Sequence, residues 1–278
     1  MKKTFPVLLL LALSTTLAAQ SPYALHWRTD LPVASLGLGT AIAGLVIGHQ
    51  VKPLEPGNIA LLHRNDVFKI DRRATYWLSS RAGHASDFFM YASEAVPFLL
   101  LAYPSVRKEV GIMAVMYVET MLLNGGITLL TKNIALRTRP FVYNPDASLS
   151  SKQGKDTRKS FFSGHTSVSS AGCFFAAKIW SDMHPDSRWK PVVWSVAATI
   201  PAVTGYLRMR AGKHFFTDVA TGYVVGAAIG WLVPSMHQSG RFQEAGVGFY
   251  GSFQGGGVVW RFSAGSKFSP KSPRTFVL

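Results

Sequence analysis

Long apolar stretches without a charged residue limit the folds that the chain can adopt. Three of them are residues 31–48, 191–207 and 219–236. An α-helix rises about 1.5 Å per residue, so about 20 mostly apolar residues cross the hydrocarbon core of a bilayer. Each stretch is therefore long enough, or nearly so, to form a membrane-spanning helix.

Three further apolar segments each carry one interrupting charge. They are 88–106 with Glu94, 110–131 with Glu119, and 163–180 with Lys178. Acidic side chains in apolar helices usually turn into the bundle interior and find partners there, so these glutamates are compatible with helices. The six segments together predict an all-α bundle of about six helices, embedded in a membrane.

The C-terminal region changes from a helical pattern to an alternating one. Apolar residues alternate on both sides of Gly255-Gly256-Gly257, at Val247, Phe249 and Phe253 and then at Val258, Trp260 and Phe262. Alternation with a period of two around glycines predicts a short β-hairpin. We therefore assign residues 237–278 to a hairpin and tail at the edge of the bundle.

The first 20 residues have the pattern of a secretory signal peptide. Lys2 and Lys3 precede an apolar run, and small residues surround Ala18. An uncleaved signal anchor is the alternative. Residues 21–87 are expected to contain the first apolar helix and a polar segment, in which 64–83 forms an amphipathic helix at the membrane surface. Residues 88–236 then form the helical core.

The charge balance indicates anionic partners. The 278 residues carry a formal net charge of +15, although only 15% of them are charged. Phosphates and acidic lipid headgroups fit this balance better than nucleic acid, because no nucleic-acid motif is present and the basic residues lie mostly between apolar segments. Cys173 is the only cysteine, so no intrachain disulfide can form, and we expect it to be a packing residue.

The first candidate site motif is "SFFSGHTS", residues 160–167, just before an apolar run. Ser163 is a good helix N-cap, and His165 after it can simply begin a helix. The free amide donors at a helix N-terminus also bind anions, and a histidine placed there would meet the anion. Anion-binding residues elsewhere in the chain would favour the second interpretation.

The second motif is "TKNIALRTRP". Lys132 and Arg139 lie seven residues apart, which is two turns of a helix, so we expect both cations on one helix face. Pro140 is expected to end that helix. The alternative is that these are basic residues that end a membrane helix at the headgroup level.

The third motif is "RMRAGKHFFTD". His214 and Asp218 lie four residues apart, so a helix would stack them and let the carboxylate accept the imidazole N–H. That pairing would leave the other ring nitrogen free as a nucleophile or base. Arg208 lies six residues before His214, and Gly212 between them allows a turn. An ordinary surface contact is the alternative for the His/Asp pair.

In this order the three motifs, K-x6-RP, SGH and R-x5-H-x3-D, resemble the signature of the type-2 phosphatidic acid phosphatase and vanadium haloperoxidase superfamily over about residues 88–236. Two positions depart from it. Phe162 stands where the family usually has proline, and Leu207 where it usually has serine. Neither residue is expected to carry charge or protons, so altered loop geometry is expected rather than loss of activity.

The resemblance implies a histidine phosphatase, a phosphoric monoester hydrolase that needs no metal or cofactor. It implies that His214, oriented by Asp218, attacks phosphorus to give a phosphohistidine, and that His165 protonates the leaving alkoxide and then activates water. The phosphate would be held by five residues: Lys132, Arg139, Ser163, Gly164 and Arg208. The sequence shows no carboxylate or His/Cys cluster with metal-ligand spacing.

The expected substrate is a phosphomonoester or pyrophosphate, of a lipid or of a small molecule. A vanadate-dependent haloperoxidase is the rival enzyme, and a non-catalytic membrane protein that binds anionic lipids is the non-enzyme alternative. No obligate protein partner is expected. Resemblance to bacterial lipid phosphatases implies the cell envelope, with the site facing the periplasm, or else a soluble periplasmic protein. The positive-inside rule argues for a cytoplasmic site if three crossings precede Lys132.

Overall fold

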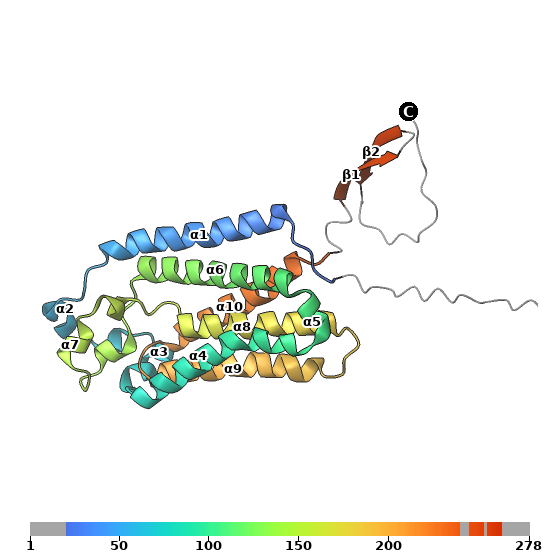
Figure 1. Cartoon of the computed structure of the whole chain (residues 1–278). Helices are drawn as coiled ribbons and strands as arrows, with labels where there is room; N and C mark the ends of the chain where they lie inside the picture. The colour runs from blue at the N-terminus through green and yellow to red at the C-terminus, as the bar shows by residue number, and fades with distance from the viewer. Residues whose placement is uncertain (1–20, 240–244, 253–254, 263–278) are drawn as a thin grey trace, which may run out of the picture.

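The structure is a computed structural model that describes residues 21–239, 245–252 and 255–262 (Figure 1). The expected signal peptide at 1–20 lies outside the described residues. Within them, six helices are 20 residues or longer: α1 (Trp27–Gln50), α4 (Ser80–Leu99), α6 (Val110–Ala135), α8 (Gly164–Met183), α9 (Lys190–Arg210) and α10 (Phe216–Met236).

Helix α8 lies in the interior of the bundle, where it packs against α4, α6, α9 and α10. Its sequence explains this position, because Ser167, Ala171 and other small residues let neighbouring backbones approach closely. Cys173, also in α8, is buried as the sequence predicted. Helix α1 instead lies at the edge of the bundle, against α6 (Figure 1).

Among the residues that the structure describes, four helical segments are long and apolar enough to cross a membrane: Trp27–Gln50, Ser80–Ala102, Val110–Tyr143 and Phe216–Met236. Apolar side chains such as Leu31, Leu36 and Ile42 of α1 are more than half exposed, which suits a lipid-facing surface. Helix α9 is not among the four, although the sequence predicted a span at 191–207. Its prolines and its serine and threonine side chains lower its mean hydropathy.

The polar segment after α1 is not the single amphipathic helix predicted at 64–83. It forms short turns instead: α2 (Pro56–Ala60), η1 (Arg64–Asp66), α3 (Lys69–Arg72) and η2 (Arg73–Tyr76). Tertiary contacts explain the difference, because Asp71 in α3 is buried and accepts hydrogen bonds from Thr217 at the start of α10. Helix α4 begins at Ser80, so the helical core starts earlier than the predicted residue 88.

The remaining short elements connect the long helices. They are η3 (Leu100–Ala102) and α5 (Pro104–Lys108) before α6, and η4 (Pro140–Tyr143), α7 (Leu149–Lys152) and η5 (Lys155–Arg158) between α6 and α8. The connection from α6 to α8 is therefore long and mostly irregular. It contributes Arg137, Arg139 and Ser160 to the site described below.

Two strands follow the helices. β1 (Ala245–Ser252) pairs antiparallel with β2 (Gly255–Phe262), with Val247 opposite Trp260. The three glycines that the sequence analysis placed at the turn belong to β2, so that detail of the prediction is wrong. Phe253 lies outside the described residues.

Helices α8 and α10 approach most closely along a row of glycines on α10. A Cβ atom added at Gly226 would lie 2.0 Å from the backbone oxygen of Ser167, and one added at Gly222 would lie 2.5 Å from that of Ser163. Real side chains do not approach so closely. The contact between these helices therefore depends on glycine at both positions.

We predict that Gly226→Ala lowers the free energy of unfolding by about 1–3 kcal/mol, the usual range for an overpacked core. Thermal unfolding of the purified protein in detergent measures the change. Gly125→Ala is the matched control, because a Cβ atom there meets nothing within 4 Å. Equal unfolding midpoints for the two variants would show that the α8–α10 contact tolerates a methyl group.

Candidate active site

All eight predicted site residues lie at one end of the bundle, where α6 and α9 end and α8 and α10 begin. Lys132 lies in the last turn of α6 and Arg208 in the last turn of α9. Ser163 and His165 lie at the start of α8, and Asp218 lies in the first turn of α10. Because α6 and α9 run toward this end and α8 and α10 run away from it, the side chains of Lys132 and Arg208 lie next to two helix N-termini.

The start of α8 is built as the sequence predicted. Ser163 is the N-cap, and its Oγ accepts a hydrogen bond from Thr166 N at 3.4 Å. Its own N–H donates to the backbone oxygen of Asp218 at 3.0 Å, which joins the starts of α8 and α10. A Cβ atom at Gly164 would lie 3.3 Å from Cγ2 of Thr128 and 3.5 Å from Cε of Lys132, so the start of α8 lies directly beside the lysine side chain.

Lys132 and Arg139 do not share a helix face, contrary to the prediction. Helix α6 ends at Ala135, and Leu136 adopts the left-handed conformation with φ 46°. Arg139 follows in extended backbone and is held by Asp156, with Nη2 2.8 Å from Oδ2 and Nε 2.9 Å from the backbone oxygen. Pro140 begins η4 rather than ending the helix. Arg139 therefore reaches the site from a loop.

Asp87 of α4 joins His165 and Arg208. Nε2 of His165 lies 2.8 Å from Asp87 Oδ1, and Nη1 of Arg208 lies 3.3 Å from the same oxygen. Nε of Arg208 is buried without a hydrogen-bond partner among the described residues, so it is free to donate to an anion. A pocket of about 270 Å³, lined by Asp87, Arg208 and Lys213 among others, opens beside them.

His214 is fully buried, and its bonding differs from the prediction. Nδ1 lies 2.7 Å from the backbone oxygen of Ser160 but 3.8 Å from Asp218 Oδ2. Because α10 begins only at Phe216, His214 does not stack on Asp218 within a helix. A carbonyl oxygen can only accept, so Nδ1 carries the proton and Nε2 keeps its lone pair. The tautomer is the one expected, but the carbonyl of Ser160 fixes it.

The Asp218 carboxylate is completely buried within a network. Oδ1 accepts from Arg137, and Oδ2 accepts from the hydroxyl of Ser160 and from Phe215 N at 2.8 Å. Arg137 also bonds to Asp71 Oδ2 at 2.7 Å. Four residues of this end of the bundle were not predicted from the sequence: Arg137, Ser160, Asp71 and Asp87. Two of them carried a local signal, since Arg137 lies two residues before Arg139 in "RTRP" and Ser160 begins "SFFSGHTS".

Both histidines are held in the neutral form. Burial lowers the pKa of His214 well below its ordinary value, and Lys132, Arg139 and Arg208 lower it further. Burial also lowers the pKa of His165 to about 4, with Arg208 adding to the effect and the hydrogen bond to Asp87 opposing it. At neutral pH, Nε2 of His214 therefore presents a lone pair among cations.

Comparison with known proteins finds a family match. Residues 113–241, which include all eight predicted site residues, match the model of the PAP2 superfamily. The probable diacylglycerol pyrophosphate phosphatase 1 of Schizosaccharomyces pombe is 33% identical over 112 residues, which cover 35% of this chain and 40% of that protein. This chain therefore spans well under half the length of that curated relative.

One solved structure also aligns with the chain. It is the first transmembrane PAP2 type phosphatidylglycerolphosphate phosphatase from Bacillus subtilis. The TM-score is 0.41 at 19% sequence identity, and the alignment covers 75% of this chain and 96% of that one.

We predict that Asp218→Ala lowers the free energy of unfolding by about 3–5 kcal/mol, because it leaves the Arg137 cation without this buried partner. Thermal or denaturant unfolding measures the change. Asp156→Ala also removes the carboxylate partner of an arginine, but that carboxylate is 74% exposed, so a loss of at most about 1 kcal/mol is expected. If both variants lose the same stability, the Asp218 network is not the stabilising element.

Proposed function

We propose that this chain is a phosphatase that hydrolyses a phosphomonoester or pyrophosphate, in particular that of a lipid, through a phosphohistidine intermediate and without a metal at its active site. The main support is the set of charged groups around His214. Its neutral Nε2 lies in a site that also receives Lys132, Arg139 and Arg208. Three cations neutralise the equatorial oxygens of a transferring phosphoryl group, which is the main requirement of phosphoryl transfer.

In the first step, Nε2 of His214 attacks phosphorus. A nitrogen–phosphorus bond forms, the bond from phosphorus to the leaving oxygen breaks, and the imidazolium of His165 gives that oxygen its proton. His165 is neutral in the free protein, but the negative charge of bound phosphate and of Asp87 favours its protonated form. Asp87 therefore supports the general acid, while Ser160 and the Asp218 network orient the nucleophile.

In the second step, water attacks the phosphohistidine. Neutral His165 accepts a proton from the water, the nitrogen–phosphorus bond breaks, and inorganic phosphate leaves. Ser163 and Gly164, at the start of α8, supply the remaining donors for the phosphate oxygens. His214 returns to its starting form, and no redox change occurs.

A lipid substrate is supported by an apolar cavity between α4, α8 and α9. It has a volume of about 420 Å³, and its lining includes Leu99, Cys173, Val196 and Ile200. Ile200 lies eight residues before Arg208 on α9, about 12 Å along the helix. An acyl chain spans about 15 Å, half of the bilayer core. A lipid whose phosphate contacts Arg208 can therefore place its chain in this cavity.

We predict that His214→Ala abolishes phosphate release from an aryl phosphate, whereas His165→Ala slows it about 10²–10⁴-fold, the usual contribution of general acid–base catalysis. Free phosphate is measured under initial-rate conditions. His184→Ala is the control and is expected to retain activity, because His184 lies at the other end of α8. Near-normal turnover by His214→Ala would exclude the proposed nucleophile.

We predict that Val196→Trp, which narrows the apolar cavity, raises KM for a long-chain lipid phosphate about tenfold, corresponding to the loss of one well-buried apolar group. Its kcat/KM for a small aryl phosphate should be unchanged. Val118→Trp is the control, because Val118 is similarly exposed but lies on α6, outside the cavity. Equal effects on the two substrates would argue against an acyl-chain site here.

The helix directions determine whether residue 21 and the active site lie on the same side of the membrane. Tyr23 pairs with Gln238, just beyond the end of α10 opposite the site. Three candidate spans, Trp27–Gln50, Ser80–Ala102 and Val110–Tyr143, lie between this segment and the site. We propose that the site faces the periplasm. If all three segments cross, residue 21 is then cytoplasmic, which conflicts with a signal peptide cleaved after residue 20.

Cysteine labelling distinguishes these orientations. In a Cys173→Ser background, we predict that Lys155→Cys at the site end is labelled in intact cells by a maleimide that cannot cross the inner membrane. Asp186→Cys, in the α8–α9 connection at the other end, should react only after permeabilisation. Both positions are exposed. The reverse pattern would place the site in the cytoplasm, and labelling of both in intact cells would support a soluble periplasmic protein.

A further inference from the structure

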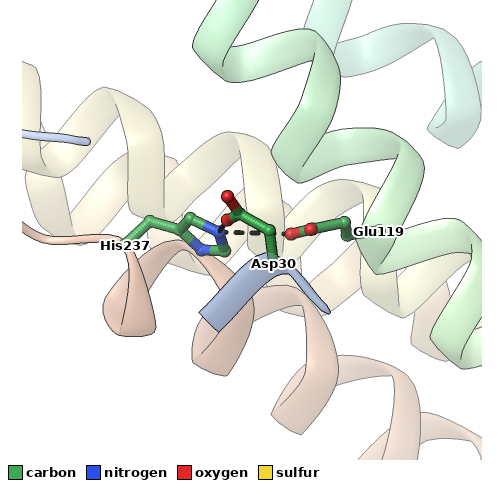
Figure 2. Close-up of side chains that lie close together, drawn as sticks. All are labelled: Asp30, Glu119 and His237. Carbon is green, nitrogen blue, oxygen red and sulfur yellow. Dashed lines mark hydrogen bonds and ion pairs between the residues drawn. The ribbon is translucent and has the colours of Figure 1, made fainter. Parts of the chain in front are cut away.

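Three side chains that are distant in the sequence meet at the end of the bundle opposite the active site (Figure 2). Asp30 lies in the first turn of α1, Glu119 lies in α6, and His237 directly follows α10. Nε2 of His237 lies 2.8 Å from Asp30 Oδ1 and 3.2 Å from Glu119 Oε2. One ligand atom from each residue lies within 4.8 Å of the other two.

The ring of His237 is oriented by the backbone. Nδ1 lies 2.8 Å from the carbonyl oxygen of Val233, which can only accept, so Nδ1 carries a proton. In the neutral ring, Nε2 therefore directs its lone pair at two carboxylate oxygens. Such a contact between three hydrogen-bond acceptors requires a proton or a metal ion between them.

A proton on Nε2 satisfies only part of this cluster. The single Nε2–H is directed to Asp30, and Glu119 Oε2 remains buried without a hydrogen bond among the described residues, although the Glu119 side chain is only 6% exposed. A buried carboxylate oxygen without a donor is unfavourable. A metal ion would be coordinated by all three groups at once.

The ligand types suit a first-row divalent metal. Imidazole nitrogen with two carboxylate oxygens is a common donor set for Zn²⁺ and its neighbours. The hydrogen bond from Nδ1 to the Val233 carbonyl is the kind of outer contact that fixes a metal-binding histidine. The Asp30 side chain is 27% exposed, so an ion can reach the cluster from solvent.

We propose that Asp30, Glu119 and His237 bind one divalent transition-metal ion, such as Zn²⁺, which links α1 to α6 and to the end of α10. Asp218 and His237 are separated by the length of α10, about 28 Å. The proposed ion is therefore structural, and it does not depend on the proposed phosphatase activity. It would secure α1, which packs mainly on α6.

Titration calorimetry with Zn²⁺ on the full chain in detergent, after removal of bound metal, tests the proposal. One ion per chain should bind, and Zn²⁺ should raise the thermal unfolding midpoint. Glu119→Gln keeps the size of the side chain and should weaken binding more than about 100-fold, beyond the usual effect of an outer-shell change. Asp182→Asn is the control, since Asp182 lies near the same end but bonds to Lys178 and Tyr23.

Asp30→Asn repeats the test at the partly exposed ligand if Glu119→Gln does not fold. The visible spectrum of bound Co²⁺ should change in both ligand variants and stay unchanged in Asp182→Asn. The proposal is wrong if the wild-type chain binds no Zn²⁺, or if it binds Zn²⁺ as tightly after both ligand substitutions. Aryl phosphate turnover, measured on the same samples, reports separately on the proposed function.

Discussion

The end of the bundle that holds the candidate active site depends on the bonds of one buried carboxylate, that of Asp218. A fully buried carboxylate is stable only when its oxygens are well bonded, and Asp218 meets this need with Arg137, Ser160 and Phe215 N. These partners come from two connecting segments. One carboxylate therefore fixes the α6–α8 connection against the start of α10.

The position of His214 follows from that network. The Ser160 hydroxyl donates a hydrogen bond to Asp218, and the Ser160 carbonyl oxygen accepts one from Nδ1 of His214, so the carboxylate positions the histidine through one intervening residue. Arg137 extends the network to Asp71 in α3 and ties the polar segment after α1 to the same site. The irregular connections are thus held by side-chain bonds to the start of α10 and to α3.

The sequence predicted the parts of the site that depend on local chemistry. Ser163 caps α8 because a serine before an apolar run favours that role, and Gly212 adopts φ +67° where a Cβ atom would lie 2.4 Å from the Trp77 oxygen. The shared face of Lys132 and Arg139 was wrong because a leucine, Leu136, takes the left-handed conformation, which leucine does not signal.

Contacts between residues that are far apart in the sequence could not be predicted from local sequence patterns. Asp87 lies just before the segment that was assigned to the core, and nothing near it in the sequence points to His165. The same limit applies to Asp30, Glu119 and His237, which have no ligand spacing in the chain and meet only because α1, α6 and α10 pack together. Such clusters become visible only once the fold is known.

The central claim is that His214 carries the phosphoryl group during turnover. Rapid acid-free quenching during hydrolysis of a radiolabelled phosphate ester, followed by peptide mass spectrometry, tests it directly. The account predicts a base-stable, acid-labile phosphoryl group on His214. It should accumulate in His165→Ala when the ester is an aryl phosphate whose leaving group needs no proton, because only the attack of water then depends on His165. A phosphoryl group on another residue, or no covalent intermediate in either protein, would contradict it.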